Sequence, residues 1–323
     1  MKPVVFVPER IAEAGLSLLS AECECVAPWV DGRKPSLAEL KTMLTTADAV
    51  LVRLFEVRTD DLTTAVRLKV IAKHGVGVDN IDVPAATARN IPVVFTPAAN
   101  GNAVAEHTIA LMFSMARNLC PASAALRNGR FTDRDKFEGT EIRHKTLGVL
   151  GLGRIGSRVA EIAHRGFEMN VVGYDPFVSK EQYAGVALVK ESLDAVLREA
   201  DFLTLHLPLT PETHRLIDAE RLSLMKAGCR IINTSRGGVI DELALVQALR
   251  EGHIASAALD VFEREPLPPD HPFQKIPNIL LTPHISALTK EALERMACDA
   301  AQGILNVLRG RRPLHIVNPE VFQ

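Results

Sequence analysis

The chain has 323 residues, enough for about two domains of ~100–200 residues each. Apolar residues make up 47% of it and charged residues 24%, so the composition indicates packed cores and excludes a disordered or fibrous chain. The 37 Lys and Arg face 39 Asp and Glu, and this net charge of −2 argues against nucleic acid or an anionic membrane as the main partner.

The sequence predicts neither a membrane span nor a disulfide framework. No apolar run approaches the ~18–20 residues that a spanning helix needs, and the amino-terminal segment lacks the features of a secretory signal. The five cysteines are scattered, and no Cys/His spacing indicates a metal site. Cys23 and Cys25 could form a redox pair, but their alternation favours a short strand. We therefore expect a cytoplasmic protein without a metal.

Short β-rich runs alternate with helical runs from the amino terminus onward. The first predicted strands are residues 3–7, 49–52, 70–73 and 92–95, and a helix is expected around 11–19. Strands separated by helical segments indicate βαβ units and a parallel sheet. This first unit is expected to end near Phe95.

A long helix is predicted after Asn100-Gly101, where Val104, Ile109 and Met112 follow helical spacing. A second alternating series begins at Thr146. Its predicted strands are residues 147–150, 171–174, 202–205, 230–233, 257–259 and 279–281, with helices near 155–165, 192–198, 243–251 and 291–308. This series predicts a second, doubly wound sheet.

The first strand of the second series leads directly into a G-x-G-x-x-G pattern that opens a helix. Gly151 permits the tight turn, Gly153 lets the backbone approach a pyrophosphate, and Gly156 allows the helix to pack closely on the strand. The next strand ends in Asp175, 19 residues after Gly156, where an acid accepts a hydrogen bond from a ribose 2′-hydroxyl and repels a 2′-phosphate. We expect a dinucleotide site that prefers NAD to NADP.

Three ionisable residues, Arg236, Glu265 and His284, follow the ends of late strands in the same predicted sheet. Ligands of open α/β sheets bind outside the carboxyl ends of the strands. Arg236 offers a planar fork for a carboxylate, and His284 titrates in the range needed to give or take a proton. Glu265 is suited to orienting the imidazole and favouring its charged form. Each of the three alone would equally suit an ordinary loop.

Several segments in a fixed order give the chain a specific resemblance. They are GVGVDNID at 75–82, NAVAEH at 102–107, GLGRIG at 151–156, HLPLT at 206–210, NTSRGG at 233–238, DVFEREP at 260–266 and TPHI at 282–285. In these segments the chain resembles the D-isomer-specific 2-hydroxyacid dehydrogenase family. The similarity extends from about residue 50 to about residue 310.

The resemblance implies site residues position by position. The family's catalytic residues fall on Arg236, Glu265 and His284. The implied NAD contacts are Gly151, Gly153, Arg154, Ile155, Gly156, Asp175, Leu207, Thr234 and Asp260. The backbone of Val76 and Gly77 is expected to hold the substrate carboxylate, with Arg53 and Arg236 as further substrate contacts.

The resemblance also implies the architecture. It is an α/β fold of two doubly wound, Rossmann-like domains with parallel sheets and a cleft between them. Residues 1–98 with 289–323 are expected to form a flavodoxin-like substrate-binding domain, and residues 99–288 an NAD-binding Rossmann domain. Members of the family usually pair through the long helix of the cofactor domain, so we expect a homodimer.

The substrate choice remains open between two classes. Segments 73–79, 136–151 and 173–176 resemble the phosphoglycerate dehydrogenases of the family. These enzymes usually follow Arg53 with a small hydroxyl residue that helps to bind phosphate, whereas this chain has Leu54-Phe55, and an apolar pair supplies no donors. The two residues either line a pocket for a small unphosphorylated acid such as hydroxypyruvate or glyoxylate, or pack the core. Because the sequence stops at Gln323, we expect no C-terminal regulatory domain.

A binding protein is the alternative from another class. Corepressors of this fold keep the NAD site but act by gripping peptides. The intact Arg-Glu-His set and the lack of a long flexible tail favour the enzyme.

Overall fold

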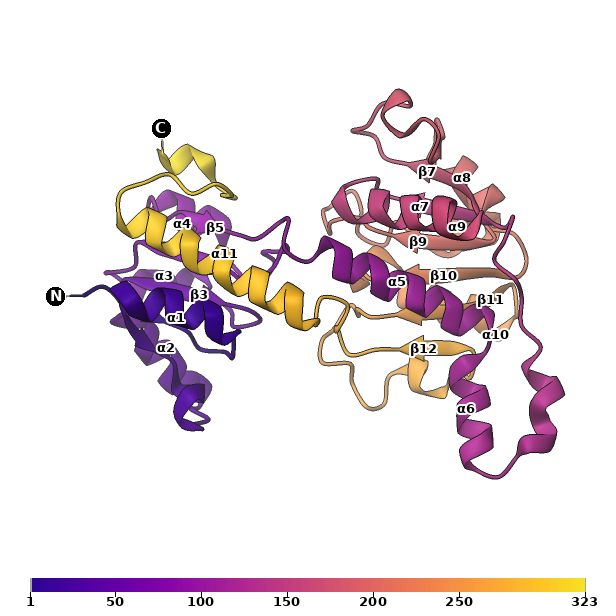
Figure 1. Ribbon diagram of the computed structural model, residues 1–323, viewed down its shortest axis with the longest axis horizontal. Coiled ribbons are helices and arrows are strands. Elements are labelled where there is room, and N and C mark those ends of the chain that lie inside the picture. The colour runs from indigo at the N-terminus through magenta and orange to yellow at the C-terminus, as the bar shows by residue number, and fades with distance from the viewer. Residues whose placement is uncertain (1, 323) are drawn as a thin grey trace. The chain divides into compact units, whose positions relative to one another are not determined.

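The computed structural model describes residues 2–322, which form two compact units. One unit takes the chain up to Asn100 and again from Leu288 onward, and the other is Gly101–Ala287. Figure 1 shows a helix-covered sheet in each unit. The predicted α/β class with two parallel sheets is confirmed.

The first unit contains a five-stranded parallel sheet in the order β2-β1-β3-β4-β5, the flavodoxin-like doubly wound order. Its strands are β1 (Val4–Phe6), β2 (Glu24–Val26), β3 (Ala49–Val52), β4 (Val70–Lys73) and β5 (Val93–Val94). Its helices are α1 (Glu13–Glu22), α2 (Leu37–Thr45), α3 (Thr59–Thr64), α4 (Val83–Ala88) and α11 (Lys290–Leu308). Cys25 lies on β2, in keeping with the short strand expected there.

Helix α11 returns to the first unit after the whole second unit and packs along α1 (Figure 1). The two helices touch at Gly15, where a Cβ atom would lie 2.6 Å from backbone and side-chain atoms of Ala297. Apolar residues of both helices and of one sheet face share one buried cluster that includes Leu19, Leu51 and Ile304. The opposite face, with Phe6, is covered by α2, α3 and α4.

The second unit contains a seven-stranded parallel sheet in the order β12-β11-β10-β9-β6-β7-β8. Its strands are β6 (Thr146–Leu150), β7 (Asn170–Tyr174), β8 (Leu188–Val189), β9 (Phe202–Leu205), β10 (Cys229–Asn233), β11 (Ile254–Leu259) and β12 (Ile279–Leu281). Its helices are α5 (Gly101–Ala116), α6 (Leu119–Arg127), α7 (Arg154–Phe167), α8 (Leu193–Glu199), α9 (Ala219–Leu224) and α10 (Glu242–Arg250). The strand order reverses between β6 and β9, which is where such sheets bind ligands.

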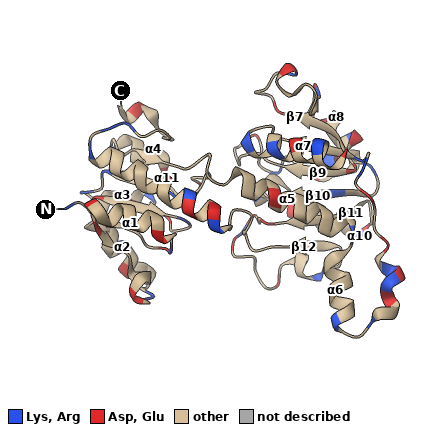
Figure 2. Cartoon of the chain, viewed as in Figure 1, with Lys and Arg blue, Asp and Glu red and all other residues tan. Residues whose placement is uncertain are grey.

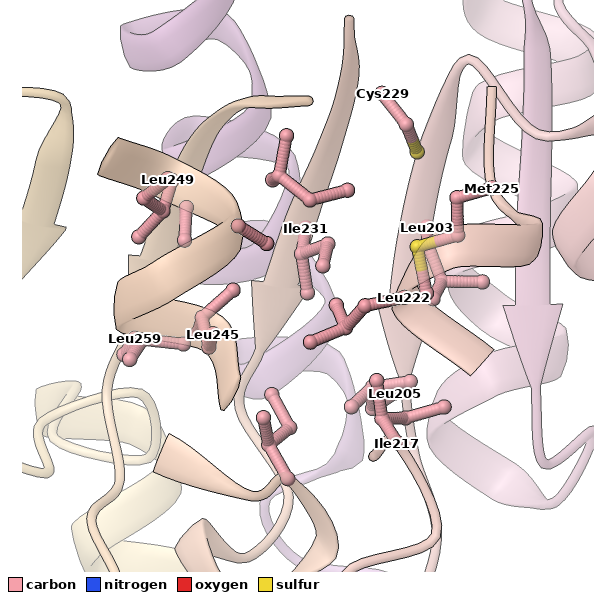
Figure 3. Close-up of a cluster of buried hydrophobic side chains, with 14 of the residues drawn as sticks. Leu203, Leu205, Ile217, Leu222, Met225, Cys229, Ile231, Leu245, Leu249 and Leu259 are labelled. Carbon is pink, nitrogen blue, oxygen red and sulfur yellow. The ribbon is translucent and has the colours of Figure 1, made fainter. Parts of the chain in front are cut away.

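Successive side chains of each strand point to opposite faces of the sheet, so the core of this unit has two layers. Ile231 packs toward α8, α9 and α10, whereas its neighbour Ile232 packs toward α5 and α7. Figure 3 shows the first layer, with Ile231 and Leu203 of the sheet near Leu222 and Leu245 of the helices. Both faces of the sheet are therefore buried, as a parallel sheet requires.

The charged residues are interspersed over both units, as Figure 2 shows and as the near balance of charges predicts. Within residues 2–322 no single helix is long and apolar enough to cross a membrane, and only the α5–α6 pair, bent by 62°, meets the length and composition test.

Candidate active site

The predicted dinucleotide loop lies at the point where the strand order reverses. Gly151 has φ +86°, and a Cβ atom there would lie 2.5 Å from the carbonyl oxygen of His206. A Cβ on Gly156 would lie 1.9 Å from the carbonyl oxygen of Gly151. By contrast, a Cβ on Gly153 would meet nothing within 4 Å. Two glycines are thus required by the fold, and the third leaves open space over the first turn of α7.

That open space suits the pyrophosphate of a dinucleotide. Gly153 is the N-cap residue of α7 and has no side chain to accept hydrogen bonds from the first N–H groups of the helix. These groups and the helix dipole favour an anion. Arg154 is exposed beside them and Ile155 is half-buried, and their contacts with the cofactor stay predictions of the resemblance.

Asp175 follows β7 and faces the same loop. Its carboxylate accepts hydrogen bonds from the backbone N–H groups of Leu152 and Phe177, at 2.9 Å each. These bonds hold an acid beside the glycine loop, at the place expected for ribose recognition. Leu207 is half-buried after β9, while Thr234 is buried and its hydroxyl lies 3.0 Å from that of Thr108.

The loop after β10 carries Arg236. The side-chain oxygen of Asn233 accepts hydrogen bonds from the N–H and hydroxyl of Ser235, and its amide donates to the carbonyl of Arg236 at 2.8 Å. The next residue, Gly237, is pressed against the loop after β11, since a Cβ there would lie 1.9 Å from the carbonyl carbon of Phe262. This close approach brings the Arg236 loop against the segment that leads to Glu265.

His284 and Glu265 form a direct pair. The imidazole Nδ1 lies 2.7 Å from Oε2 of Glu265, and both side chains keep exposed surface, 41% and 33%. Because an ionised carboxylate only accepts hydrogen bonds, Nδ1 carries the proton and Nε2 is the nitrogen left for a ligand. The other oxygen, Oε1, accepts from the N–H of Phe262 at 3.0 Å.

Several interactions hold Glu265 ionised. Burial by itself would raise the pKa of this carboxyl, but the hydrogen bond and charge of His284, the N–H of Phe262 and the charge of Arg236 outweigh it. The pKa of Glu265 therefore lies below its ordinary value. The positive charge of Arg236 is thus close enough to Glu265 to favour its ionised form.

Asp260 builds the loop that carries His284. Its carboxylate accepts from the hydroxyl of Thr282 at 2.6 Å and from the N–H groups of Ile285 and Ser286 at 2.8 Å. His284 is thereby held with φ +52°, a conformation that non-glycine residues rarely adopt. Asp260 has no exposed surface, and its contact with the cofactor stays a prediction of the resemblance.

The comparisons with known proteins agree with this geometry. Residues 109–286 match the model of the NAD-binding domain of D-isomer specific 2-hydroxyacid dehydrogenases. The chain belongs to this family. The family resemblance and the NAD cofactor expected from the sequence are thereby confirmed.

Family members of two activities are similar to this chain. The D-3-phosphoglycerate dehydrogenase of Methanocaldococcus jannaschii is 47% identical over 283 residues, which cover 87% of this chain and 53% of that protein. The glyoxylate reductase of Thermofilum pendens is 40% identical over 330 residues, covering 100% of this chain and 96% of the reductase. The chain spans about half the length of the phosphoglycerate dehydrogenases that it matches.

Several solved structures superpose along almost the whole chain. The TT0316 protein of Thermus thermophilus has a TM-score of 0.88 at 38% identity, covering 97% of this chain and 99% of that one. The D-lactate dehydrogenase of Aquifex aeolicus, solved with NAD and lactic acid, has a TM-score of 0.84 at 29% identity, covering 98% and 99%. An NADPH-dependent glyoxylate/hydroxypyruvate reductase of Sinorhizobium meliloti scores 0.86 at 28% identity, covering 98% and 97%.

The predicted substrate residues of the first unit lie on two neighbouring loops. Arg53 follows β3 and is half-buried, while Val76 and Gly77 follow β4 and keep exposed surface. Leu54 is 70% exposed, but Phe55 is only 7% exposed and packs edge-on against Phe6 at 5.9 Å. Of the two alternatives left open for this pair, the structure therefore favours core packing for Phe55, because its ring belongs to the core of the first unit.

Three other histidines, two near strand ends and one on α5, have structural surroundings. Burial lowers the pKa of His206 to about 3, and burial followed by the charge of Arg53 lowers that of His74 to about 4, so both are neutral. His107 lies on α5, and its Nε2 is 3.4 Å from the hydroxyl of Thr282, within hydrogen-bonding distance. In the described part of the chain, no group of three or more His, Cys, Asp or Glu residues could hold a metal ion.

A buried carboxylate that the sequence did not point to supports the loop that carries Glu265. Glu242, at the start of α10, accepts from the N–H of Glu263 at 2.8 Å and pairs with Nε2 of His271 at 3.1 Å. It anchors the loop between Phe262 and Glu265 from a different element. No local pattern marked it, because an acid in the first turn of a helix is common.

Proposed function

We propose that this protein is an NAD-dependent D-2-hydroxyacid dehydrogenase that interconverts a small, unphosphorylated 2-hydroxy acid and its 2-oxo acid, of the hydroxypyruvate or glyoxylate type. The observation that carries the reaction type is the 2.7 Å pair of His284 and Glu265 beside the Arg236 loop. It joins a proton donor, its orienting carboxylate and a cation on loops at the carboxyl ends of β10, β11 and β12.

The three side chains have distinct roles in this proposal. Bound NADH supplies the hydride. Arg236 grips the substrate carboxylate and polarises the carbonyl oxygen, because its guanidinium matches both acceptors. Protonated Nε2 of His284 donates to the oxygen that becomes the hydroxyl, while Glu265 accepts from Nδ1 and stabilises the charged ring. In the reverse direction neutral Nε2 takes the proton.

The preference for an unphosphorylated acid rests on Leu54. Its exposed side chain stands beside Arg53, where a phosphate would need several charge-assisted donors. The full-length similarity to a glyoxylate reductase supports this preference. The second candidate substrate is 3-phosphoglycerate, favoured by the higher identity to phosphoglycerate dehydrogenases.

A panel of NADH-oxidation assays separates these candidates. It contains hydroxypyruvate, glyoxylate, pyruvate, a branched 2-oxo acid and phosphohydroxypyruvate, with NADPH as the cofactor control. We expect the highest kcat/KM on an unphosphorylated acid. Leu54→Ser is expected to raise kcat/KM for phosphohydroxypyruvate relative to kcat/KM for that acid. Turnover of the phosphorylated acid alone would overturn the substrate preference. If none of these acids is turned over although the protein binds NADH, the result would favour the corepressor-like binding protein.

We further propose a homodimer located in the cytoplasm. Helix α6 and the short helix Phe131–Phe137 after it carry three exposed apolar side chains, Leu119, Leu126 and Phe131, which a second copy would cover. Light scattering on the purified protein tests the dimer, and cell fractionation tests the location.

A further inference from the structure

The loop that carries Arg53 is organised around a carboxylate from the segment that follows a neighbouring strand. Three consecutive backbone N–H groups, those of Arg53, Leu54 and Phe55, donate to the side chain of Glu9 at 2.7 to 2.9 Å. Glu9 lies beyond the end of β1, which pairs with β3. Converging N–H groups form a concave anion site, and here the chain's own carboxylate fills it.

The carbonyl groups of the same loop are held from the other side. The ammonium of Lys73, a residue only 8% exposed at the end of β4, donates to the carbonyl of Arg53 and to the side-chain oxygen of Asn80. The amide of Asn80 donates to the carbonyl of Phe55 at 2.7 Å. Asn80 belongs to the segment that follows Val76 and Gly77, so these bonds also tie together the two loops that carry the predicted substrate contacts.

The segment around Glu9 also fixes the direction of the Arg53 side chain. Nη1 of Arg53 donates to the carbonyl of Arg10 at 2.9 Å. With its N–H groups bound to Glu9 and the Phe55 ring buried, the loop leaves Leu54 facing outward at 70% exposure. The position of both Arg53 and Leu54 therefore depends on Glu9 and its neighbour.

We propose that Glu9 is a positioning residue for substrate binding, which sets the Arg53–Leu54 loop without touching the substrate. This inference rests on the proposed function. A carboxylate suits the task because it accepts several hydrogen bonds and donates none. Oε2 of Glu9 accepts from all three N–H groups, and Oε1 accepts only from that of Leu54. A glutamine that keeps its oxygen in the place of Oε2 would turn its NH₂ group toward the N–H of Leu54, so that two donors would face each other. Its neutral oxygen is also a weaker acceptor than a carboxylate, so the loop would shift.

The test compares Glu9→Gln and Glu9→Asp with Glu13→Gln, a matched loss of charge at an exposed position at the start of α1. Glu9→Gln is expected to raise KM for the preferred 2-oxo acid about ten-fold, because small displacements of a binding group are costly, while kcat and the Kd for NADH change less than about two-fold. Glu9→Asp keeps a group that only accepts hydrogen bonds, so its KM for the same acid is expected to lie much closer to the wild-type value than that of Glu9→Gln. The Glu13→Gln control is expected to match wild type.

A readout independent of turnover accompanies the kinetics. Hydrogen exchange of a peptide covering residues 53–55 is expected to speed up in Glu9→Gln and to stay slow in Glu9→Asp and Glu13→Gln. Binding of oxamate, an unreactive 2-oxo acid analogue, to the NADH-loaded protein is expected to weaken in parallel. Unchanged exchange in Glu9→Gln, or faster exchange with unchanged KM and oxamate affinity, would overturn the role of Glu9. Wild-type protein that turns over no 2-oxo acid would refute the proposed function, and exchange and oxamate binding would still decide the role of Glu9.

Discussion

A methyl group at position 237 tests whether the Arg236 loop must lie directly against the Glu265 loop. In Gly237→Ala the new Cβ would lie 1.9 Å from the carbonyl carbon of Phe262 and 2.3 Å from the backbone nitrogen of Glu263. Ordinary contact begins near 3.4 Å, so the loops must separate by 3.4 − 1.9 = 1.5 Å. The neighbour that must give way is backbone, which cannot rotate aside as a side chain can.

This separation acts on the catalytic geometry because Glu265 moves with its loop. Its Oε1 is bound to the N–H of Phe262, the residue that the methyl group displaces. A shift of this size is expected to lower kcat/KM about 100-fold, or about 2.7 kcal/mol of transition-state stabilisation. Overpacking is expected to cost about 1–3 kcal/mol of unfolding free energy as well.

The assay measures kcat/KM by NADH oxidation, the Kd for NADH by fluorescence and the unfolding free energy by urea titration. Gly166→Ala is the matched control, since a Cβ there meets nothing within 4 Å and alanine favours a helix. It is expected to keep full activity and to gain about 0.5–1 kcal/mol of stability. A folded Gly237→Ala protein with kcat/KM within three-fold of wild type (roughly 0.65 kcal/mol) would refute the argument that these two loops must touch.

Four further outcomes are expected. Gly153→Ala should raise the Kd for NADH about ten-fold with little change in melting temperature, as its Cβ points into space left for a ligand and not into the protein. Asp175→Ala should lower the ratio of kcat/KM with NADH to kcat/KM with NADPH, because the carboxylate that repels a 2′-phosphate is lost. An unchanged ratio would show that Asp175 does not recognise the ribose. Phe55→Ala should cost about 3–5 kcal/mol in urea unfolding, whereas a loss of substrate affinity alone would restore Phe55 to the pocket. Because folding lowers the pKa of Glu265, the stability that this carboxylate contributes is complete above pH 4.5 and is lost as the pH falls through the pKa of the folded state. The difference in unfolding free energy between wild type and Glu265→Gln should therefore shrink over that pH range. A difference that stays constant would contradict this assignment.

Much of the architecture could be predicted because parallel sheets buried on both faces leave strong apolar runs in the sequence. The strands at β3, β4 and β9 are confirmed almost residue for residue. The two-residue strand β8, at the edge of its sheet, is not among the predicted elements, and neither are the helices α2, α3, α4, α6 and α9. Of these, β8, α3, α4 and α9 have six residues or fewer and complete too little of a period to stand out, so tertiary contacts decide whether they form.

In the candidate site, the residues of the motifs could be predicted from the sequence, whereas the residues that hold those motifs in place could not. The glycine loop and the pairing of His284 with Glu265 could be anticipated, because each chemical role restricts the residue type and its place at a strand end. Glu9 and Glu242 could not be anticipated, since a carboxylate that binds backbone N–H groups of a loop distant in sequence leaves no local pattern. For Phe55, burial could not be told from ligand contact, because both select an apolar side chain.

The contact between Gly15 and Ala297 has a consequence for biosynthesis. Every residue of the second unit is translated before α11, so that unit can fold while the first unit still lacks the helix that covers one face of its sheet. At ~5–20 residues per second, the 187 residues of 101–287 impose a delay of about 9–40 s between the synthesis of the two parts of the first unit. During that interval the apolar face around Leu19 and Leu51 is open to chaperones and to other nascent chains, so folding on the ribosome is most exposed to aggregation there.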